Sequence, residues 1–189
     1  MTIKELPKII KTQRLELRQL EPVLENAQLI FDALRNENSQ DYFFNPVVTP
    51  DILPKSAEEM LEQMNREEKY SANGIIYYIF LDGELIGYKR FYFFDDETKT
   101  LQSSAVWLKK SARGHGYAKE VMDLVEDISF NQLGANRITR QCSVENTSSA
   151  SSIKNSGYHL DGIARQACVN LDGTLYDNML WSKLKSEYK

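Results

Sequence analysis

The sequence predicts an α+β fold built on a mostly antiparallel sheet of about seven strands. Ile75–Leu81 and Glu84–Phe94 are apolar, strand-length segments on either side of Asp82-Gly83, a typical hairpin turn. Leu101–Leu108 then leads through a glycine-containing turn into a helix, and another strand follows at Arg137–Val144. A strand, a helix and a strand in succession form a βαβ unit. We therefore expect the last two strands to be parallel neighbours.

The N-terminal segment predicts one strand and then a helix. Thr12–Leu20 alternates apolar and polar residues as a half-buried strand does, which places Leu15 and Leu17 in the core and Arg14 outside. From Pro22 onward, apolar residues recur at helical spacing, and proline is tolerated at the start of a helix.

A second helix should begin near Ser56, because Ser56 and Glu59 have the spacing of a capping box. The segment before it, residues 36–54, is irregular. Its three consecutive aromatic residues either anchor the loop on the core or line a substrate pocket; they are Tyr42, Phe43 and Phe44.

Three elements are expected in the C-terminal part. A short helix should begin at Asn146 or Thr147 and end at Gly157, a typical helix-ending residue. Tyr158–Asn170 and Leu175–Lys183 predict two more strands, joined by a turn at Asp172-Gly173.

Composition limits the function. With 189 residues, 42% of them hydrophobic, the chain should form a single globular domain over residues 1–189. The net charge of −4 argues against a nucleic-acid-binding protein with a broad basic face. No apolar run approaches the roughly 20 residues that span a bilayer, and the N-terminus lacks a signal-peptide core, so we expect a cytoplasmic protein without membrane attachment. The cysteine and histidine residues are too few and too scattered for a disulfide framework or a metal site.

The turn after Leu108 is the strongest functional signal. Gly114 and Gly116 precede a helix whose apolar face includes Val121 and Val125, and whose other face carries acidic residues that include Glu126. A helix N-terminus attracts anions, and glycine lets the backbone approach them closely. The surrounding cations are Lys109, Lys110, Arg113 and Lys119. The segment therefore predicts a diphosphate-binding site. An ordinary glycine turn before a helix is the alternative.

Spacing separates the cofactors that use such a turn. A dinucleotide fold needs a third small residue where this chain has Lys119, and a nucleotide-triphosphate loop needs a Gly-Lys-Ser/Thr ending that is absent. Arg113, Gly116 and Ala118 instead fit Arg/Gln-x-x-Gly-x-Gly/Ala, which resembles the acetyl-CoA pyrophosphate loop of the GNAT superfamily of N-acetyltransferases. The resemblance implies helices on both faces of the sheet and an acetyl-CoA-binding βαβ unit. The implied coenzyme-binding residues of this loop are Arg113, Gly114, His115, Gly116, Tyr117 and Ala118.

Two further motifs resemble one GNAT branch, which includes ribosomal-protein alanine and serine N-acetyltransferases. The first is Thr-x-Arg-Leu-x-Leu-Arg at residues 12–18, and the second is Asn146-x-x-Ser149 before a helix that closes on Gly157. The resemblance implies that Asn146 contacts the pantetheine arm or acetyl region and that Ser149 lies near the thioester sulfur. A plain helix N-cap is the other role for Asn146, and both roles can coexist.

The resemblance also implies how transfer would work. A splay between two strands admits the pantetheine arm, and a backbone N–H near Trp107 or Leu108 polarises the thioester carbonyl. Many GNAT members carry a tyrosine acid where this chain has Ile153. In the ribosomal-protein branch the proposed donor is a serine, and the resemblance places it at Ser149. The glutamate base of the branch falls at Cys168, which leaves Glu145 as a substitute; an exposed strand-end carboxylate or water-relayed deprotonation is the alternative.

We therefore expect an acetyl-CoA-dependent N-acetyltransferase that acts by direct attack in a ternary complex, without a metal. The acceptor is a primary amine, either a protein N-terminus or a small molecule, and the family is compatible with a homodimer. A non-catalytic acyl-CoA-binding sensor is the alternative, because the tyrosine and the glutamate are missing. A nucleotide-binding regulator fits the turn less well.

Overall fold

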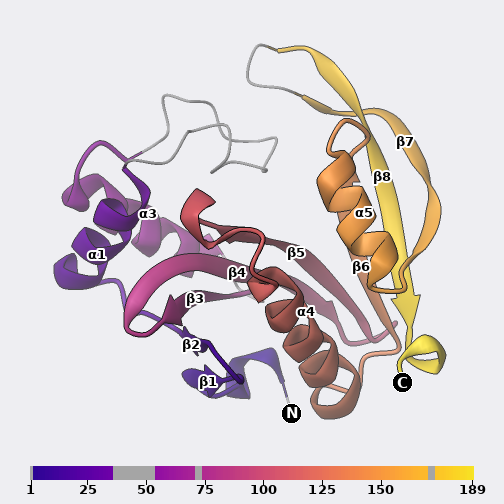
Figure 1. Ribbon diagram of the computed structural model, residues 1–189, viewed down its shortest axis with the longest axis horizontal. Coiled ribbons are helices and arrows are strands. Elements are labelled where there is room, and N and C mark those ends of the chain that lie inside the picture. The colour runs from indigo at the N-terminus through magenta and orange to yellow at the C-terminus, as the bar shows by residue number, and fades with distance from the viewer. Residues whose placement is uncertain (1, 36–53, 71–73, 170–172) are drawn as a thin grey trace.

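A computed structural model describes residues 2–35, 54–70, 74–169 and 173–189 (Figure 1). In this part of the chain, one eight-stranded sheet has the order β1-β2-β3-β4-β5-β6-β8-β7. The strands are β1 (Ile9–Lys11), β2 (Glu16–Arg18), β3 (Ile75–Leu81), β4 (Glu84–Asp95), β5 (Thr100–Leu108), β6 (Arg137–Ser143), β7 (His159–Val169) and β8 (Leu175–Leu184). The helices are α1 (Leu24–Leu34), α3 (Ala57–Tyr70), α4 (Tyr117–Asp127) and α5 (Thr147–Asn155).

The predicted mixed, mostly antiparallel sheet is confirmed. β5 and β6, which α4 connects along the chain, pair in parallel. Each other neighbouring pair in the described sheet is antiparallel. The predicted β3–β4 hairpin also forms. Asp82 and Gly83 have φ values of 49° and 86°, the left-handed conformations that a tight hairpin turn with the twist of the sheet requires.

The predicted strand at Thr12–Leu20 forms only over Glu16–Arg18, and the eighth strand is β1, which precedes the predicted segment at Ile9–Lys11. The Thr12 N–H donates to the Leu15 carbonyl at 2.9 Å, and the Leu15 N–H donates to Thr12 Oγ1 at 3.0 Å. These bonds close a tight turn between β1 and β2, and the two strands pair as a hairpin. A threonine side chain that binds its own turn overrides the alternating pattern.

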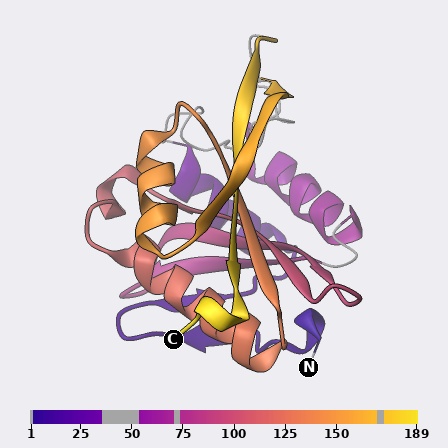
Figure 2. The same ribbon diagram turned by 90° about the vertical axis from the view of Figure 1, so that its right-hand side faces the viewer.

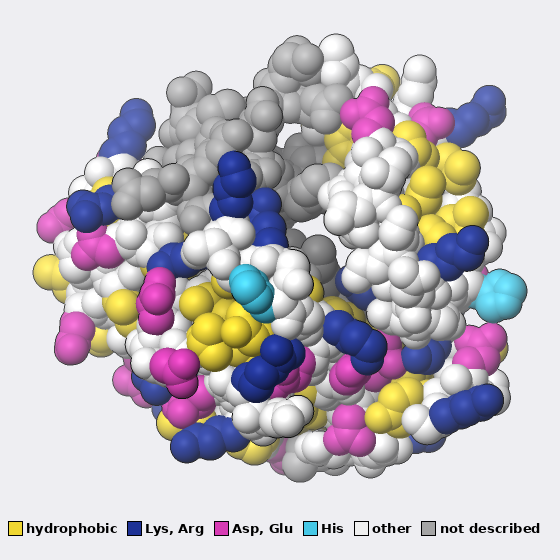
Figure 3. Space-filling model, viewed as in Figure 1, with side chains coloured by type: hydrophobic (Ala, Val, Ile, Leu, Met, Phe, Trp, Pro, Cys, Tyr) yellow, Lys and Arg dark blue, Asp and Glu magenta, His cyan; other side chains and the backbone are white. Residues whose placement is uncertain are grey.

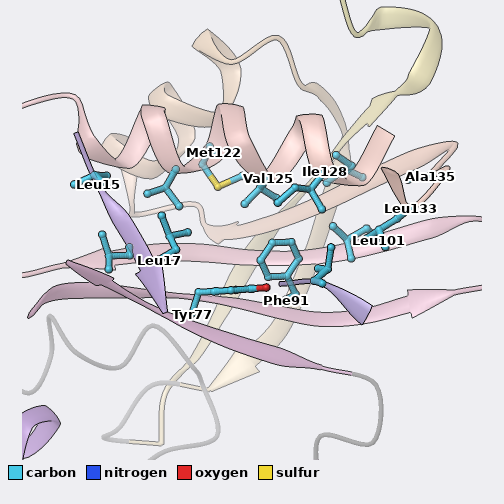
Figure 4. Packing of buried hydrophobic residues seen from close by; sticks show 14 of the residues in the cluster. Leu15, Leu17, Tyr77, Phe91, Leu101, Met122, Val125, Ile128, Leu133 and Ala135 are labelled. Carbon is cyan, nitrogen blue, oxygen red and sulfur yellow. The ribbon is translucent and has the colours of Figure 1, made fainter. Parts of the chain in front are cut away.

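Two hydrophobic clusters lie on opposite faces of the sheet, and helices cover both faces (Figure 2). The larger one packs α4 against the central strands, with Val125 above Phe91 and Tyr77 (Figure 4). The smaller one packs α1 and α3 against the other face through Ile30 and Met60. Leu15 and Leu17 are buried in the larger cluster, as the sequence predicts.

One acidic residue of α4 lies inside the molecule rather than on the polar face that the sequence predicts. Glu126 is buried, and its Oε2 accepts a hydrogen bond from Lys183 Nζ of β8 at 2.7 Å. Lys183 also donates to the Ser156 carbonyl at 2.9 Å. Helical spacing alone could not reveal this position, because the cation that compensates the carboxylate comes from a strand 57 residues away.

The caps and C-terminal elements follow the sequence closely. Ser56 Oγ accepts from the Glu59 N–H at the start of α3, although the Glu59 carboxylate bonds to the Lys55 N–H rather than to that of Ser56. Helix α5 ends at Asn155, and Gly157, with a φ of 80° and an N–H that donates to the Lys154 carbonyl, closes the turn after it. The aromatic residues Tyr42, Phe43 and Phe44, and Asp172 of the last predicted turn, lie outside the described residues.

Among the helices of the described ranges, none is both long enough and apolar enough to cross a membrane. The same ranges contain no group of three or more His, Cys, Asp or Glu side chains placed to hold a metal ion.

The buried Glu126–Lys183 pair gives a prediction about stability. Glu126→Leu should lower the free energy of unfolding by about 3–5 kcal/mol, because it leaves the Lys183 ammonium buried without its carboxylate. The double variant Glu126→Leu/Lys183→Met, which removes both charges, should regain most of that loss. Urea unfolding of the two variants beside the parent measures this coupling, and equal losses in both would contradict it.

Candidate active site

The candidate site lies at the point where β5 and β6 separate. The two strands pair only over Thr100–Gln102 and Arg137–Thr139, although β5 continues to Leu108 and β6 to Ser143. Beyond the paired residues, β5 stays bonded to β4 and β6 stays bonded to β8. The strands therefore diverge into an opening that has α4 and α5 beside it (Figure 1), and the molecular surface is hollowed in this region (Figure 3).

The ladder between β4 and β5 decides which backbone groups of β5 face this opening. The Lys109 N–H donates to the Ile86 carbonyl at 2.8 Å, and Trp107 lies opposite Tyr88. N–H groups alternate in direction along an antiparallel strand. The Trp107 N–H therefore points toward β4, whereas those of Val106 and Leu108 point toward the opening. Of the two residues predicted to polarise the thioester, Leu108 has the suitable orientation.

Gly87 allows β4 and β5 to approach closely at this point. A Cβ atom added to Gly87 would lie 2.2 Å from the Trp107 carbonyl oxygen, a distance that no side chain can tolerate. A glycine inside a strand therefore marks a close approach of two backbones here.

The loop between β5 and α4 has the backbone of an anion-binding turn. Gly114 and Gly116 both have a φ of 81°, a left-handed conformation that favours glycine. Gly116 is the N-cap residue of α4 and supplies no side chain to cap it, so the N–H groups of the first turn stay available to a ligand. Arg113 Nε donates to the Leu108 carbonyl at 2.9 Å, which ties the loop to the end of β5.

The side chains of the loop are only partly available for coenzyme. Lys109 pairs with Glu84 at 2.9 Å, and Lys119 pairs with Asp123 at 2.5 Å, so carboxylates neutralise two of the four predicted cations. The rings of His115 and Tyr117 lie 5.7 Å apart. Figure 3 shows Lys and Arg side chains beside the hollow.

Sequence reasoning missed a support for this loop, which comes from the β1–β2 turn. Arg14 Nε donates to Glu120 Oε2 at 2.7 Å, and Arg14 Nη1 donates to the His115 carbonyl at 3.0 Å. The guanidinium also lies 4.6 Å from the centre of the Tyr117 ring. Arg14, expected to face solvent, thus lies against the loop and joins it to the first turn of α4.

Thr12 completes the support through the same carboxylate. Its hydroxyl donates to Glu120 Oε1 at 2.5 Å, and the Arg14 N–H donates to the same oxygen at 2.9 Å. Burial by itself raises the pKa of Glu120, but the hydrogen bonds from Thr12 and Arg14 outweigh it, so the pKa lies below its usual range. The signal that could have found this contact is Thr-x-Arg at residues 12–14 together with an acidic residue in the first turn of α4.

The second motif lies across the opening, where β6 passes into α5. Asn146 Oδ1 accepts a hydrogen bond from the Ser149 N–H at 2.9 Å, so Asn146 is the N-cap of α5. Ser149 is half-buried beside the Cys142 thiol. Burial raises the pKa of that thiol, and the neighbouring side chains of Trp181 and Ser149 partly offset the rise.

The residues considered for acid–base chemistry differ in burial. Glu145 is exposed, and its N–H donates to Ser143 Oγ at 3.1 Å. Ile153, at the position of the family's tyrosine, is buried with 1% of its surface exposed. Cys168 is half-buried on β7, and burial together with this cysteine raises the pKa of Tyr176 to about 12. Neither Ile153 nor Cys168 supplies a catalytic carboxylate or phenol.

A family model for the acetyltransferase (GNAT) domain matches residues 14–159, which is most of the chain. The chain belongs to the GNAT family of acetyltransferases. The match includes both sides of the β5–β6 opening and the whole glycine loop, and the predicted family is confirmed.

Individual GNAT relatives agree with this assignment. An uncharacterized N-acetyltransferase p20 of Bacillus licheniformis is 27% identical over 178 residues, which cover 94% of this chain and 96% of the relative. A solved probable GNAT acetyltransferase of Chromobacterium violaceum has a TM-score of 0.81 at 18% identity, covering 97% of this chain and 89% of that chain. A ribosomal L7/L12 alpha-N-protein acetyltransferase, solved in complex with coenzyme A, has a TM-score of 0.74 at 19% identity, covering 93% and 97%.

The Glu120 contact gives a prediction with a pH dependence. Glu120→Gln should lower the melting temperature at pH 7 by roughly 2–4 °C, because the neutral amide loses the ion pair with Arg14. A lowered pKa stabilises the fold above the ordinary glutamate pKa, and this stabilisation is lost as the pH falls through the lower pKa of the folded protein. Melting curves of both proteins should therefore converge in acid. A constant difference at every pH would contradict the charge-based explanation.

Proposed function

We propose that residues 1–189 form a single N-acetyltransferase domain that transfers an acetyl group from acetyl-CoA to a primary amine. The observation that carries the proposal is the combination of the glycine loop at the N-terminus of α4 with the β5–β6 opening that begins beside it. The family supplies the reaction type. Among solved structures of the same fold, a microcin C7 self-immunity acetyltransferase was determined with acetyl-CoA and AMP (TM-score 0.73, 21% identity).

In this proposal, the residues on the β5 side bind the coenzyme. The N–H groups from Gly114 to Ala118 surround the pyrophosphate, with Gly116 leaving room for it and Arg113 holding the loop on Leu108. The pantetheine arm extends into the opening. Acetyl-CoA supplies the acetyl group as an activated thioester.

The chemistry needs three proton and charge movements. The Leu108 N–H, directed into the opening, donates to the oxyanion that develops when the amine attacks the carbonyl carbon. Ser149 donates a proton to the sulfur as the carbon–sulfur bond breaks. The amine loses its proton to water or to Glu145, whose exposed position favours the water route. Attack is direct, so both substrates are bound together.

The acceptor is an amine of a protein N-terminus or of a small molecule. We expect residues 36–74 to shape its pocket, and residues 36–53 and 71–73 of this segment lie outside the described residues. The name of one structural neighbour, a ribosomal-protein acetyltransferase, supports including N-terminal peptides among the acceptors to be tested.

The experiment that tests the function is calorimetric titration with acetyl-CoA followed by thiol release against a panel of amines and N-terminal peptides. We expect micromolar binding and amine-dependent release of coenzyme A. Binding without release for any amine would favour the second candidate, a non-catalytic acyl-CoA sensor. The buried Ile153 and the half-buried Cys168, at the positions of the family's acid and base, favour that alternative.

Gly116 tests the coenzyme loop directly. Gly116→Asp should weaken acetyl-CoA binding at least tenfold, because it places a negative charge beside the pyrophosphate and strains the backbone at a φ of 81°. Gly116→Asn, which has the same shape without the charge, should bind more tightly than Gly116→Asp. Calorimetry on the two variants separates charge from strain. Unimpaired binding by Gly116→Asp would show that this loop does not hold the pyrophosphate.

Ser149 tests the proton donor. Ser149→Ala should lower kcat roughly 100-fold and leave the affinity for acetyl-CoA nearly unchanged. Alanine keeps the backbone N–H that donates to Asn146 Oδ1, so the helix cap is retained. Ser148→Ala, at an exposed neighbouring position of α5, is the matched control and should retain full turnover. If both alanine variants turn over at the parent rate, Ser149 is structural.

A further inference from the structure

Four charged side chains are buried on the α4 side of the sheet. Lys89 on β4, Arg140 on β6 and Lys183 on β8 are cations, and Glu126 on α4 is the one acidic residue among the buried polar groups of the described chain. Their exposed fractions range from 0 to 8%. Buried charges are unfavourable unless an opposite charge and hydrogen bonds compensate them. Among these four buried side chains of the described structure, three are cations and one is an anion.

The partners of these groups differ. Glu126 is bonded to Lys183 at 2.7 Å, which accounts for one pair. Lys89 Nζ donates to Ser103 Oγ and to the Arg90 carbonyl, both at 2.9 Å. Burial lowers the pKa of Lys89, and repulsion from the nearby Arg140 lowers it further.

Arg140 has no hydrogen bond to a carboxylate in the described structure, although the charge of Glu126 acts on it. Its Nη1 is buried without a hydrogen-bond partner in the described part of the chain. The ring of Tyr158, 5.4 Å from the guanidinium carbon, offers only a cation–π contact. Burial lowers the pKa of the guanidinium, against the weaker opposing effects of Tyr158 and Glu126. Arginine nevertheless stays charged at physiological pH, so this site keeps a positive charge.

The cluster lies at the closed end of the β5–β6 opening. Ser103 and Arg140 immediately follow Gln102 and Thr139, the last paired residues of the two strands. Val106, whose N–H faces the same opening, is three residues farther along β5. At about 3.3 Å per residue, it lies at most roughly 10 Å from Ser103 along the strand. Arg140 thus lies on β6 directly beside the point where the two strands separate.

We propose that Arg140, with Lys89 beside it, binds a carboxylate carried by a substrate of the transfer reaction. The inference rests on the proposed function and deepens it by naming a substrate class. A guanidinium binds a carboxylate through two parallel hydrogen bonds, which would satisfy the orphaned Nη1. Two substrates present such a group: a dicarboxylic acyl thioester such as succinyl-CoA, and an amine acceptor that carries a carboxylate, such as an amino acid.

A substrate-binding role and a purely structural role of Arg140 predict opposite changes in stability when the arginine is replaced. Replacing a buried, uncompensated arginine by an apolar residue of similar size should leave the fold as stable or more stable. A structural arginine would instead lose stability on the same change. Arg140→Met therefore separates the two roles. Arg137→Met is the matched control, because Arg137 lies on the same strand but is an exposed partner of Asp161.

The first test uses carboxylates alone, so it does not depend on turnover. Melting temperatures are measured in sodium succinate and sodium acetate against sodium chloride at equal ionic strength. We expect the carboxylates to raise the melting temperature of the parent and of Arg137→Met above its value in chloride. Arg140→Met should melt at or above the parent in chloride and show no added response. A parent that does not respond, or an Arg140→Met that still responds, would overturn the proposal. If Arg140→Met fails to fold, Arg140→Gln takes its place in every arm.

The second test identifies the source of the carboxylate. Thiol release is compared for succinyl-CoA against acetyl-CoA, and for an amino acid against its amide. The proposal predicts at least a tenfold preference in kcat/KM for the carboxylate in one pair, and its loss in Arg140→Met. A preference for succinyl-CoA shows that the carboxylate belongs to the acyl chain. A preference for the amino acid over its amide shows that the carboxylate belongs to the amine acceptor. Turnover without either preference overturns the inference while acetyl transfer stands. Absence of acetyl-CoA binding refutes the proposed function instead, and the melting test still decides whether Arg140 binds carboxylate.

Discussion

The shortness of the β5–β6 ladder is the constraint on which the rest of this structure depends. The two parallel strands share only three residue pairs. Beyond these pairs, the backbone groups of one strand do not bond to those of the other. β4 and β8 satisfy the outer edges, whereas the inner edges face an opening. Because backbone N–H groups are obligatory donors, an inner edge that stays unbonded is prepared to bind a ligand. The short ladder thereby creates the opening that we propose as the substrate site.

The surrounding elements hold that opening in shape. Gly87 brings β4 close behind β5, and Arg113 fastens the glycine loop to the Leu108 carbonyl. On the other side, Asn146 caps the N-terminus of α5, the helix that carries Ser149, where the chain leaves β6. The Arg14–Glu120 contact adds a brace from the first hairpin, more than a hundred residues away in sequence. Each support acts on backbone position, which is what a site made of N–H groups requires.

Charge is distributed unevenly around the opening. Carboxylates already neutralise Lys109 and Lys119 of the glycine loop, so in the proposed coenzyme site the backbone and the helix dipole are the main groups that attract phosphate. At the closed end, in contrast, Arg140 is buried without a carboxylate of its own in the described structure. An excess cation inside a protein with a net charge of −4 is an arrangement that a bound anion would complete.

The sequence by itself determined the order of elements, the parallel β5–β6 crossover, the glycine conformations at residues 114 and 116, and the family, because each depends on local spacing or on backbone geometry that glycine permits. Only the tertiary structure decided that Thr12–Leu15 is a turn, that Glu120 and Glu126 face cations rather than water, and that the Leu108 N–H rather than that of Trp107 faces the opening. These depend on partners distant in the chain and on ladder register. Periodicity predicts which side of an element is apolar, but a buried carboxylate becomes acceptable only when a remote cation meets it.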